Sequence, residues 1–298
     1  AQPGKDHDPT FEWVNMYATD NMNLDQTALA ELARSLSASE RATRIYGQHL
    51  RLSNRVHPLF TDVDRTWCFE CHDLTILNNE GVCGTCSSSS VVAFNHVSSL
   101  PINPLYPVIC ALDPHPRKPH MLIWVQVSPD DDLHQVWEME VDGSPDVVKE
   151  RVDEIEAEHG WKTIRRLMDP NMGRSPSSSD RETTWQDSFA KAGLTFDLAD
   201  DGEAGRQAIN DLLKPDSFTE RPRIRWDERC MKSIQQMKRY SWEDYKRSME
   251  KDQKQKAKQK FDDFPTLTKY VVNSNPTFRD LKSIGHKVVY AGERRNGY

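Results

Sequence analysis

The clearest pattern of apolar and polar positions lies in the second half of the chain and is typical of an α/β domain. Apolar runs at 108–113 and 121–127 and an alternating segment at 133–141 predict three strands joined by short turns. Runs at 163–169 and 194–198 predict a fourth and a fifth strand, and helical patterns separate them. This order of elements favours a mixed β-sheet flanked by helices.

Helix signals accompany these strands. Ser144 and Pro145 suit the start of a helix, and Gly160 suits its end. Further helices are expected at 184–192, 203–213, 228–239, 241–259 and 262–273. The first half of the chain is less regular. Helical spacing at 25–36 and 39–49 predicts an N-terminal helical extension, and the stretch that follows shows little periodicity.

Composition and charge narrow the function classes. The 298 residues carry a formal net charge of −7, which argues against a general nucleic-acid coat but leaves room for a basic groove beside an acidic site. No apolar run approaches the length of a membrane span, and the polar start at Ala1 is unlike a signal peptide. The chain lacks an initiator Met, so we expect it to be processed or cut from a longer one. A reducing cytoplasm, without secretion, is the expected location.

Four cysteines in one short stretch predict a structural zinc site. Cys68 and Cys71 form one CxxC pair, and Cys83 and Cys86 form a second. Each pair aims two thiolates at one point, and two pairs complete a tetrahedron around Zn²⁺. Two disulfides are the alternative, although CxxC pairs are strained as structural bridges and nothing else indicates secretion. A closed four-cysteine site is structural, so the expected zinc knuckle would not be the catalytic centre.

Aspartates stand where two expected strands end. Asp113 and Asp169 are each followed directly by proline, which stops a strand and leaves the carboxylate at the sheet edge. Asp262 and Asp263 open the last expected helix. Converging carboxylates favour Mg²⁺ or Mn²⁺, and two such ions about 4 Å apart would activate a water and stabilise the leaving oxygen of a phosphodiester. Asp-Pro turns and helix-capping aspartates are the alternative interpretation.

Residues 108–273 resemble the nuclease domain of the large terminase subunit of tailed bacteriophages. The likeness is carried by the stretches at 111–120, 168–175, 184–190, 193–201 and 262–270. The resemblance implies a ribonuclease H-like fold and an endonuclease that cuts concatemeric viral DNA during genome packaging. It also implies three catalytic acids that bind two metal ions. These acids fall on Asp113, Asp169 and Asp263, with Asp262 beside the third.

The resemblance extends upstream of residue 108, but it does not include the family's ATPase motif. Residues 24–60 are similar to the segment that leaves the family's ATPase domain, yet the sequence has no Walker A phosphate-binding loop. We therefore expect either an excised nuclease fragment or a separately made nuclease subunit. The implied partners are double-stranded DNA, the terminase ATPase region, the small terminase subunit and the portal, with no membrane. The implied location is the host cell cytoplasm, with transient residence at the procapsid portal.

Basic residues follow the first two acids. His115, Arg117, Lys118 and His120 come directly after the first acid, and Arg174 follows the second. We expect them to hold a DNA phosphate beside the metals, because loops beyond strand ends are where ligands bind in open α/β sheets. A solvated turn between two strands is the alternative for the first group.

The expected organisation has four parts. Residues 1–60 form a helical extension or a linker from an ATPase-type region, 61–105 the zinc-binding module and linker, 106–273 the nuclease domain, and 274–298 a C-terminal tail. Two rival interpretations stay open. One is a transposase-like nuclease of the same fold, and the other is a zinc-stapled subunit that docks on DNA or the portal without catalysis of its own.

Overall fold

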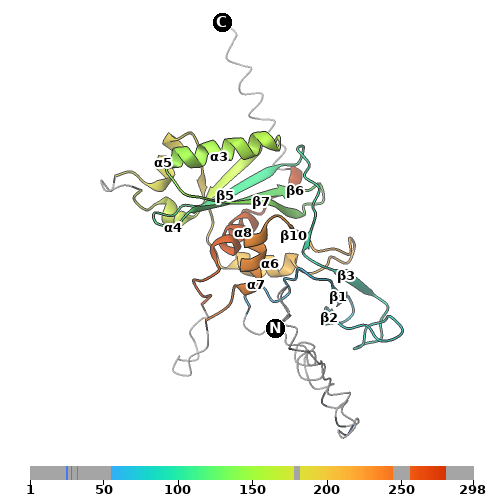
Figure 1. Ribbon diagram of the computed structural model, residues 1–298. Helices are drawn as coiled ribbons and strands as arrows, with labels where there is room; N and C mark the ends of the chain where they lie inside the picture. Colours follow the sequence, from blue (N-terminus) through green and yellow to red (C-terminus); the bar gives the residue numbers. More distant parts are fainter. Residues whose placement is uncertain are drawn as a thin grey trace, which may run out of the picture. The chain divides into compact units, whose positions relative to one another are not determined.

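The computed structural model in Figure 1 describes residues 55–177, 182–243 and 256–279, together with Asp25, Ala28 and Leu32. Ala28 and Leu32 are helical. The rest of the helices expected at 25–36 and 39–49 lies outside the described residues, as does the tail from residue 280.

The chain divides into two compact units. One contains residues 65–93, with the two CxxC pairs, and the other contains 56–64 and the residues from 94 onward. Residues 94–105, which the sequence assigned to the zinc module and its linker, are thus grouped with the larger unit.

The larger unit is built on a seven-stranded sheet with the order β4-β10-β7-β6-β5-β8-β9. Its strands are β4 (Val97–Ser98), β5 (Val108–Asp113), β6 (His120–Val127), β7 (Leu133–Val141), β8 (Thr163–Met168), β9 (Asp197–Leu198) and β10 (Ile224–Asp227). Within this sheet, β6 is antiparallel to β5 and β7, and all the other neighbouring pairs are parallel. The five strands expected from the sequence occupy adjacent places, so the predicted mixed sheet is confirmed.

Helices cover both faces of this sheet. They are α3 (Pro145–Glu158), α4 (Pro170–Gly173), α5 (Trp185–Lys191), α6 (Ala204–Leu212), α7 (Met231–Arg239) and α8 (Asp263–Asn273). In Figure 1, α3 and α5 lie on one face, and α6, α7 and α8 lie on the other. Each face has its own hydrophobic core, because β5 and β6 are buried on both sides.

The alternation of side chains along β5 decides where its terminal aspartate lies. Ile109 and Ala111 enter the core beneath α8, whereas Cys110 and Leu112 enter the core beneath α3. Successive residues of a strand point to opposite faces. Asp113 therefore emerges on the α8 side of the sheet, which is the side where Asp263 begins its helix.

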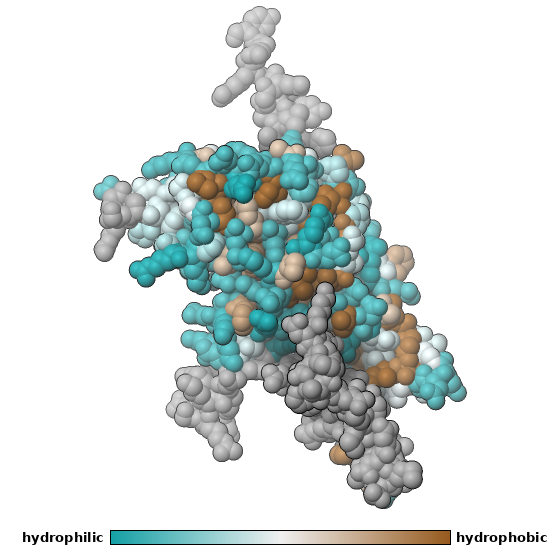
Figure 2. Space-filling model, in the orientation of Figure 1, coloured by the Kyte–Doolittle hydropathy of each residue, from teal (hydrophilic) through white to brown (hydrophobic). Residues whose placement is uncertain are grey.

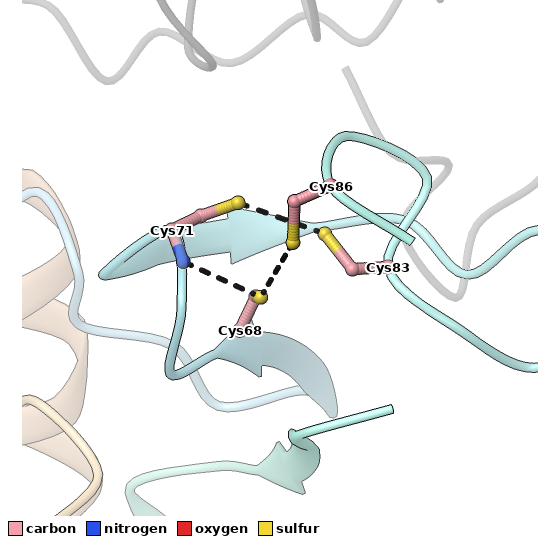
Figure 3. Close-up of side chains that lie close together, drawn as sticks. All are labelled: Cys68, Cys71, Cys83 and Cys86. Carbon is pink, nitrogen blue, oxygen red and sulfur yellow. Dashed lines mark hydrogen bonds between the residues drawn. The ribbon is translucent and has the colours of Figure 1, made fainter. Parts of the chain in front are cut away.

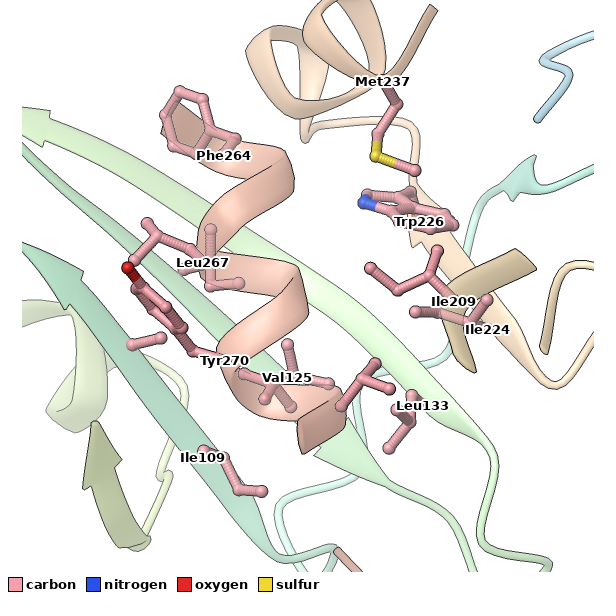
Figure 4. Close-up of a cluster of buried hydrophobic side chains, with 14 of the residues drawn as sticks. Ile109, Val125, Leu133, Ile209, Ile224, Trp226, Met237, Phe264, Leu267 and Tyr270 are labelled. Carbon is pink, nitrogen blue, oxygen red and sulfur yellow. The ribbon is translucent and has the colours of Figure 1, made fainter. Parts of the chain in front are cut away.

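Helix α8 is fixed to the sheet by an apolar face. Phe264, Leu267 and Tyr270 are buried and belong to the same hydrophobic core as strand residues such as Ile109 and Val125 (Figure 4). Burial of one large apolar side chain contributes about 1.5–3 kcal/mol. These contacts hold the first residue of α8 in place against the sheet.

Two sequence expectations fail in the larger unit. Strand β10 was missed because Arg225 stands between the buried Ile224 and Trp226, in a segment with other arginines that hides the apolar alternation. The helix expected at 241–259 is wrong at both described ends, where Trp242 and Ala257 instead form an antiparallel bridge. Its middle lies outside the described residues.

The smaller unit contains a three-stranded sheet in the order β2-β1-β3, with strands β1 (Arg65–Cys68), β2 (Asp73–Thr75) and β3 (Val91–Phe94). Strands β1 and β2 are antiparallel, and Cys68 is paired with Asp73 at the turn that carries Cys71. The sequence showed no strand pattern here, because strands of three or four residues are too short for a visible period.

The face of the molecule in Figure 2 is predominantly hydrophilic. Among the described residues, the most exposed large apolar side chains are Phe218, Leu105 and Met231. Within the same residues, no helix has both the length and the apolar character needed to cross a bilayer.

Candidate functional site

Two aspartates lie at one edge of the large sheet. Asp113 is the last residue of β5, and Asp169 directly follows the last residue of β8. These strands are parallel neighbours, and the Asp169 N–H donates to the Leu112 carbonyl over 2.9 Å. Neighbouring parallel strands end at the same edge, where ligands bind in open α/β sheets. The fold therefore brings the two acids together.

A third aspartate reaches this edge from α8. Ligand oxygens of Asp113 and Asp263 and a ring nitrogen of His115 all lie within 4.8 Å of one another. The three groups come from a strand end, the loop after it and a helix start. This compact set has the donor types of a candidate metal centre.

Electrostatics in the site disfavours its negative charges. Burial, followed by the charges of Asp169, Asp263 and Asp262, raises the pKa of Asp113 to about 7, and Lys118 acts in the opposite direction. Burial and the charge of Asp263 also raise the pKa of Asp262. Carboxylates that repel one another in a buried place are stabilised by a cation.

Asp169 is held by hydrogen bonds on both oxygens. Its Oδ1 accepts from the Met172 N–H over 2.6 Å, which caps α4, and its Oδ2 accepts from the Tyr270 hydroxyl. Burial, together with this hydrogen bond, raises the pKa of Tyr270, so the phenol stays protonated and keeps its donor role. The carboxylate of Asp169 is therefore fixed in orientation by one residue of its own loop and one of α8.

The acids of α8 are held differently. The Gln236 side chain from α7 donates to Asp263 Oδ2 over 3.2 Å and accepts from the Phe264 N–H over 2.9 Å. Asp262 is the N-cap residue, but its side chain makes no capping hydrogen bond. The carboxyl group of Asp262 is thus not used to cap the helix, the alternative that the sequence left open.

The loop after β5 is fastened by a buried histidine. His120 Nδ1 accepts from the His115 N–H over 3.0 Å, and its Nε2 donates to the Gly143 carbonyl over 3.0 Å. The ring is 2% exposed and packs edge-on against Trp185 and Phe189. Both ring nitrogens of His120 are therefore engaged within the protein and its ring is covered, whereas the sequence reasoning expected it to face a DNA phosphate.

The three arginine and lysine residues of the expected DNA contact are accessible, whereas His115 is half-buried. Arg117 and Lys118 are exposed in the loop after Asp113, and Arg174 is exposed at the end of α4, five residues after Asp169. Each acid at the sheet edge is therefore followed by a cation that faces solvent.

The sequence reasoning missed Tyr270 and Gln236. Tyr270 had a readable signal, because it lies two helical turns after Asp263 and so shares its face of α8. Gln236 had no signal in the sequence, because a glutamine that contacts a neighbouring helix looks the same in the pattern as a glutamine that faces solvent.

The four cysteines of the smaller unit converge as well (Figure 3). Cys68 Sγ lies 3.6 Å from Cys86 Sγ, and Cys71 Sγ lies 3.8 Å from Cys83 Sγ. All four sulfurs lie within 4.8 Å of one another. Disulfides are excluded at these separations, which match the edges of about 3.8 Å that four Zn–S bonds of about 2.3 Å would produce.

Donors surround two of these sulfurs. The Cys71 N–H points to Cys68 Sγ over 3.5 Å, and the Thr85 N–H points to Cys83 Sγ over 3.4 Å. The Thr75 hydroxyl lies 3.0 Å from Cys83 Sγ. Burial would raise the pKa of Cys83, but these donors outweigh burial and lower the pKa to about 6. Burial and the neighbouring thiols raise the pKa of Cys68 and Cys71, so the cluster gathers thiols whose ionisation a metal ion would favour.

Comparisons with known proteins give no match by sequence. No protein-family model matches the chain, and no curated protein is significantly similar to it. Solved structures do match. The large terminase from the thermophilic bacteriophage D6E is 13% identical with a TM-score of 0.49, over 86% of this chain and 54% of that one. The P22 large terminase nuclease domain is 16% identical with a TM-score of 0.45, over 62% of this chain and 91% of that one.

A third match is the large terminase nuclease from the thermophilic phage G20c, 10% identical with a TM-score of 0.35, over 56% of this chain and 82% of that one. All three are phage large terminases or their nuclease domains. This is the family that residues 108–273 resemble. The chain spans about half the length of the D6E terminase. With identities of 16% or less and TM-scores below 0.5, these matches assign no functional residue in this chain.

Proposed function

We propose that this chain is a metal-dependent DNA endonuclease, the nuclease part of a phage large terminase with a ribonuclease H-like fold. The observation that carries the proposal is the convergence of Asp113 and Asp263, beside Asp169 at the end of the neighbouring strand, where burial and the charges of these acids raise the pKa of Asp113. Carboxylates held in this way need the counter-charge that divalent cations provide. The substrate would be concatemeric viral DNA, cut during genome packaging.

The same three aspartates would hold two Mg²⁺ or Mn²⁺ ions, with Asp262 beside them. The donor set fits, because carboxylate oxygens are the ligands that these cations prefer. When bound, the metals supply an activated water and neutralise negative charge on the phosphate. The chain contributes orientation, through the hydrogen bonds that Tyr270 and Gln236 make to the carboxylates.

DNA would be held by the cations beside the acids. Arg117 and Lys118 follow the first acid, and Arg174 follows the second, so each can meet a phosphate next to the reacting one. Contacts of this kind fix position without reading bases, so sequence preference should be low. We leave His120 out of this contact because it is buried.

The smaller unit would hold one structural Zn²⁺ through its four cysteines. The sulfur separations and the N–H donors fit a closed tetrahedral site, which fixes a fold and carries out no chemistry. In the packaging machine, the partners would be the terminase ATPase region, the small terminase subunit and the portal. The chain would work in the host cytoplasm and, transiently, at the procapsid portal.

Plasmid cleavage tests this proposal. Zinc-loaded protein is incubated with supercoiled plasmid in Mn²⁺, in Mg²⁺ and without added metal, and nicked and linear products are measured. Asp113→Asn keeps the shape of the side chain but removes the charge, and we expect cleavage to fall by at least about a hundredfold, in line with a metal contribution of several kcal/mol. Asp142→Asn is the matched control, because Asp142 is an exposed aspartate of the same unit.

Equal cleavage rates in the wild type and Asp113→Asn would refute the proposed catalytic site. Absence of cleavage by the wild type in every metal would favour the docking subunit without catalysis. Loss of cleavage in Asp142→Asn as well would mean that any lost carboxylate disturbs the domain.

A further inference from the structure

We propose that His115 is a metal ligand, so that one cation of the candidate site is held by a mixed set of Asp113, His115 and Asp263. This inference rests on the proposed function of the carboxylate site but goes beyond it. The family resemblance implies acids alone, whereas the geometry adds an imidazole nitrogen.

The first observation is proximity. A ring nitrogen of His115 lies within 4.8 Å of ligand oxygens of both Asp113 and Asp263. His115 follows Asp113 by two positions, with the buried Pro114 between them. Proline restricts the backbone at this turn, so the carboxylate and the imidazole are presented together.

The second observation is an unpaired atom. His115 Nδ1 is shielded from solvent and has no hydrogen-bond partner among the residues that the structure describes. Buried polar atoms are almost always paired, and one that is left unpaired destabilises the fold. Ten buried side-chain atoms of the described residues lack a partner, and His115 is the one of these residues that also lies in the carboxylate cluster, where the charges favour a cation over an anion.

The third observation is that the loop is built to hold His115 in place. Its backbone N–H is fixed by His120, whose other ring nitrogen is fastened to the Gly143 carbonyl. The His120 ring is covered by two aromatic side chains. A histidine that merely touched solvent or DNA would not need this support, whereas a metal ligand must be held within a narrow range of positions.

Asp169 provides the contrast within the site. It lies near enough to raise the pKa of Asp113, but it is not one of the three groups whose ligand atoms cluster within 4.8 Å. Both of its oxygens already accept hydrogen bonds. We assign Asp169 to the second cation and the mixed set to the first.

An imidazole changes the metal that the site prefers. Mg²⁺ favours a shell of oxygen atoms, whereas imidazole nitrogen suits first-row transition ions. We therefore expect Mn²⁺ to bind more tightly than Mg²⁺. The variant His115→Asp restores an all-oxygen ligand set, and we expect it to reduce the ratio of Mn²⁺ affinity to Mg²⁺ affinity by about tenfold or more, the scale of losses around metal ligands.

Pulsed electron paramagnetic resonance of bound Mn²⁺ reads the ligand directly. The sample is untagged, zinc-loaded full chain with Mn²⁺ below stoichiometry, and the signal is the ¹⁴N hyperfine coupling of a coordinated imidazole. We expect the coupling in the wild type and in Lys162→Gln, an exposed lysine outside the site, and its loss in His115→Asp and His115→Asn. Calorimetric titration with Mn²⁺ and Mg²⁺ gives the affinities, and plasmid cleavage is measured on the same samples.

The outcomes separate the two proposals. Mn²⁺ binding and cleavage that depend on Asp113, without ¹⁴N coupling, would overturn the role of His115 and leave the nuclease standing. Coupling that persists in both His115 variants would assign the nitrogen to another residue and also overturn it. No Mn²⁺ binding and no cleavage in the wild type would overturn both. Because the wild-type spectrum alone can refute the inference, it does not depend on how well the variants fold.

Discussion

The cysteine cluster and the carboxylate cluster are both candidate metal sites, but the chain assembles them in different ways. The cysteines lie within residues 68–86, where two short turns bring the sulfurs together. Asp113, Asp169 and Asp263 come from the ends of two strands and the start of a helix, and they meet only after the sheet and α8 have formed. A local site can gain or lose order with its metal, whereas a site made of distant residues is in place before any metal binds.

The two clusters also differ in the interactions that favour or oppose their negative charges. In the cysteine cluster, hydrogen bonds from Thr75 and backbone N–H groups favour a thiolate at Cys83, whereas burial and the neighbouring thiols raise the pKa of Cys68 and Cys71. In the carboxylate cluster, burial and like charges work against the anions. The hydrophobic contacts of α8 hold that arrangement together (Figure 4). Metal removal should therefore loosen the first site and leave the second folded.

Zinc removal tests the local character of the cysteine site. We expect Cys83→Ser to abolish zinc binding and hydrogen-exchange protection at residues 65–93, because structural zinc contributes about 10–16 kcal/mol of binding free energy in small zinc domains. Metal content and exchange by mass spectrometry measure both effects, and Thr85→Ala, which keeps its N–H donor, is the control. Mn²⁺-dependent cleavage should change little. If a sample that is stripped of zinc by a chelator and then given Mg²⁺ keeps full thermal stability, the structural role of zinc is refuted.

The neighbouring aspartates of α8 test the tertiary character of the other site. Asp263 contributes to the cluster within 4.8 Å, and Asp262 does not. We expect Asp263→Asn to lower the cleavage rate by about a hundredfold or more, consistent with several kcal/mol of metal stabilisation. Asp262→Asn, one position away, should retain most of the rate. The comparison uses single-turnover cleavage in Mn²⁺, and equal losses in the two variants would refute the assignment.

The sequence was a good guide to the local site for a physical reason. Paired CxxC spacing places four cysteines within a few turns, so no tertiary contact is needed to predict that their sulfurs converge. The carboxylate site could be found only in part. Proline after Asp113 and Asp169 marks strand ends, and the alternation along β5 sets the face on which the first acid emerges.

What the sequence hid was the tertiary support. Nothing in the pattern indicates that the Tyr270 hydroxyl meets Asp169, or that His120 turns inward to hold the backbone of His115. A histidine among basic residues reads as a surface contact until its burial is known. Strand β10 was hidden for a related reason, because its arginines resemble a solvated segment.

The raised pKa of Asp113 makes the stability of the carboxylate site depend on pH below neutrality. The pKa is about 7 in the folded protein against an ordinary value of 3.8, so the folded state binds the extra proton between these values. The contribution of this protonation to the free energy of unfolding is fully present below about pH 4 and is lost as the pH rises to 7. Without Mg²⁺ or Mn²⁺, we expect Asp113 to contribute a loss of about 2 kcal/mol of unfolding free energy between pH 5 and 7. The loss is read as the difference between the wild type and Asp113→Asn, because His57, His96 and His134, whose pKa burial lowers to about 4, change stability in the opposite sense over this range. Urea denaturation of zinc-loaded protein measures this loss.

Asp113→Asn is the variant that isolates this titration. The loss should be absent from Asp113→Asn and should persist in Asp142→Asn, whose exposed carboxylate does not contribute to the cluster. A loss of the same size in Asp113→Asn would place its origin elsewhere. Saturating Mn²⁺ should also abolish it, because the cation replaces the proton as the counter-charge.

The smallest expected effect concerns a single hydroxyl group, that of Tyr270, which orients the carboxylate of Asp169. Tyr270→Phe keeps the aromatic ring in the core but removes the donor to Asp169 Oδ2, leaving the carboxylate held by the Met172 N–H alone. We expect Mn²⁺ affinity to fall by about tenfold, the usual effect of losing a partner that orients a ligand. Tyr106→Phe, a partly buried tyrosine that packs on Phe278, is the control. Zinc content should not change in either variant. Unchanged Mn²⁺ affinity in Tyr270→Phe would mean that the α4 cap alone fixes Asp169, and that this part of the carboxylate site is as local as the cysteine cluster.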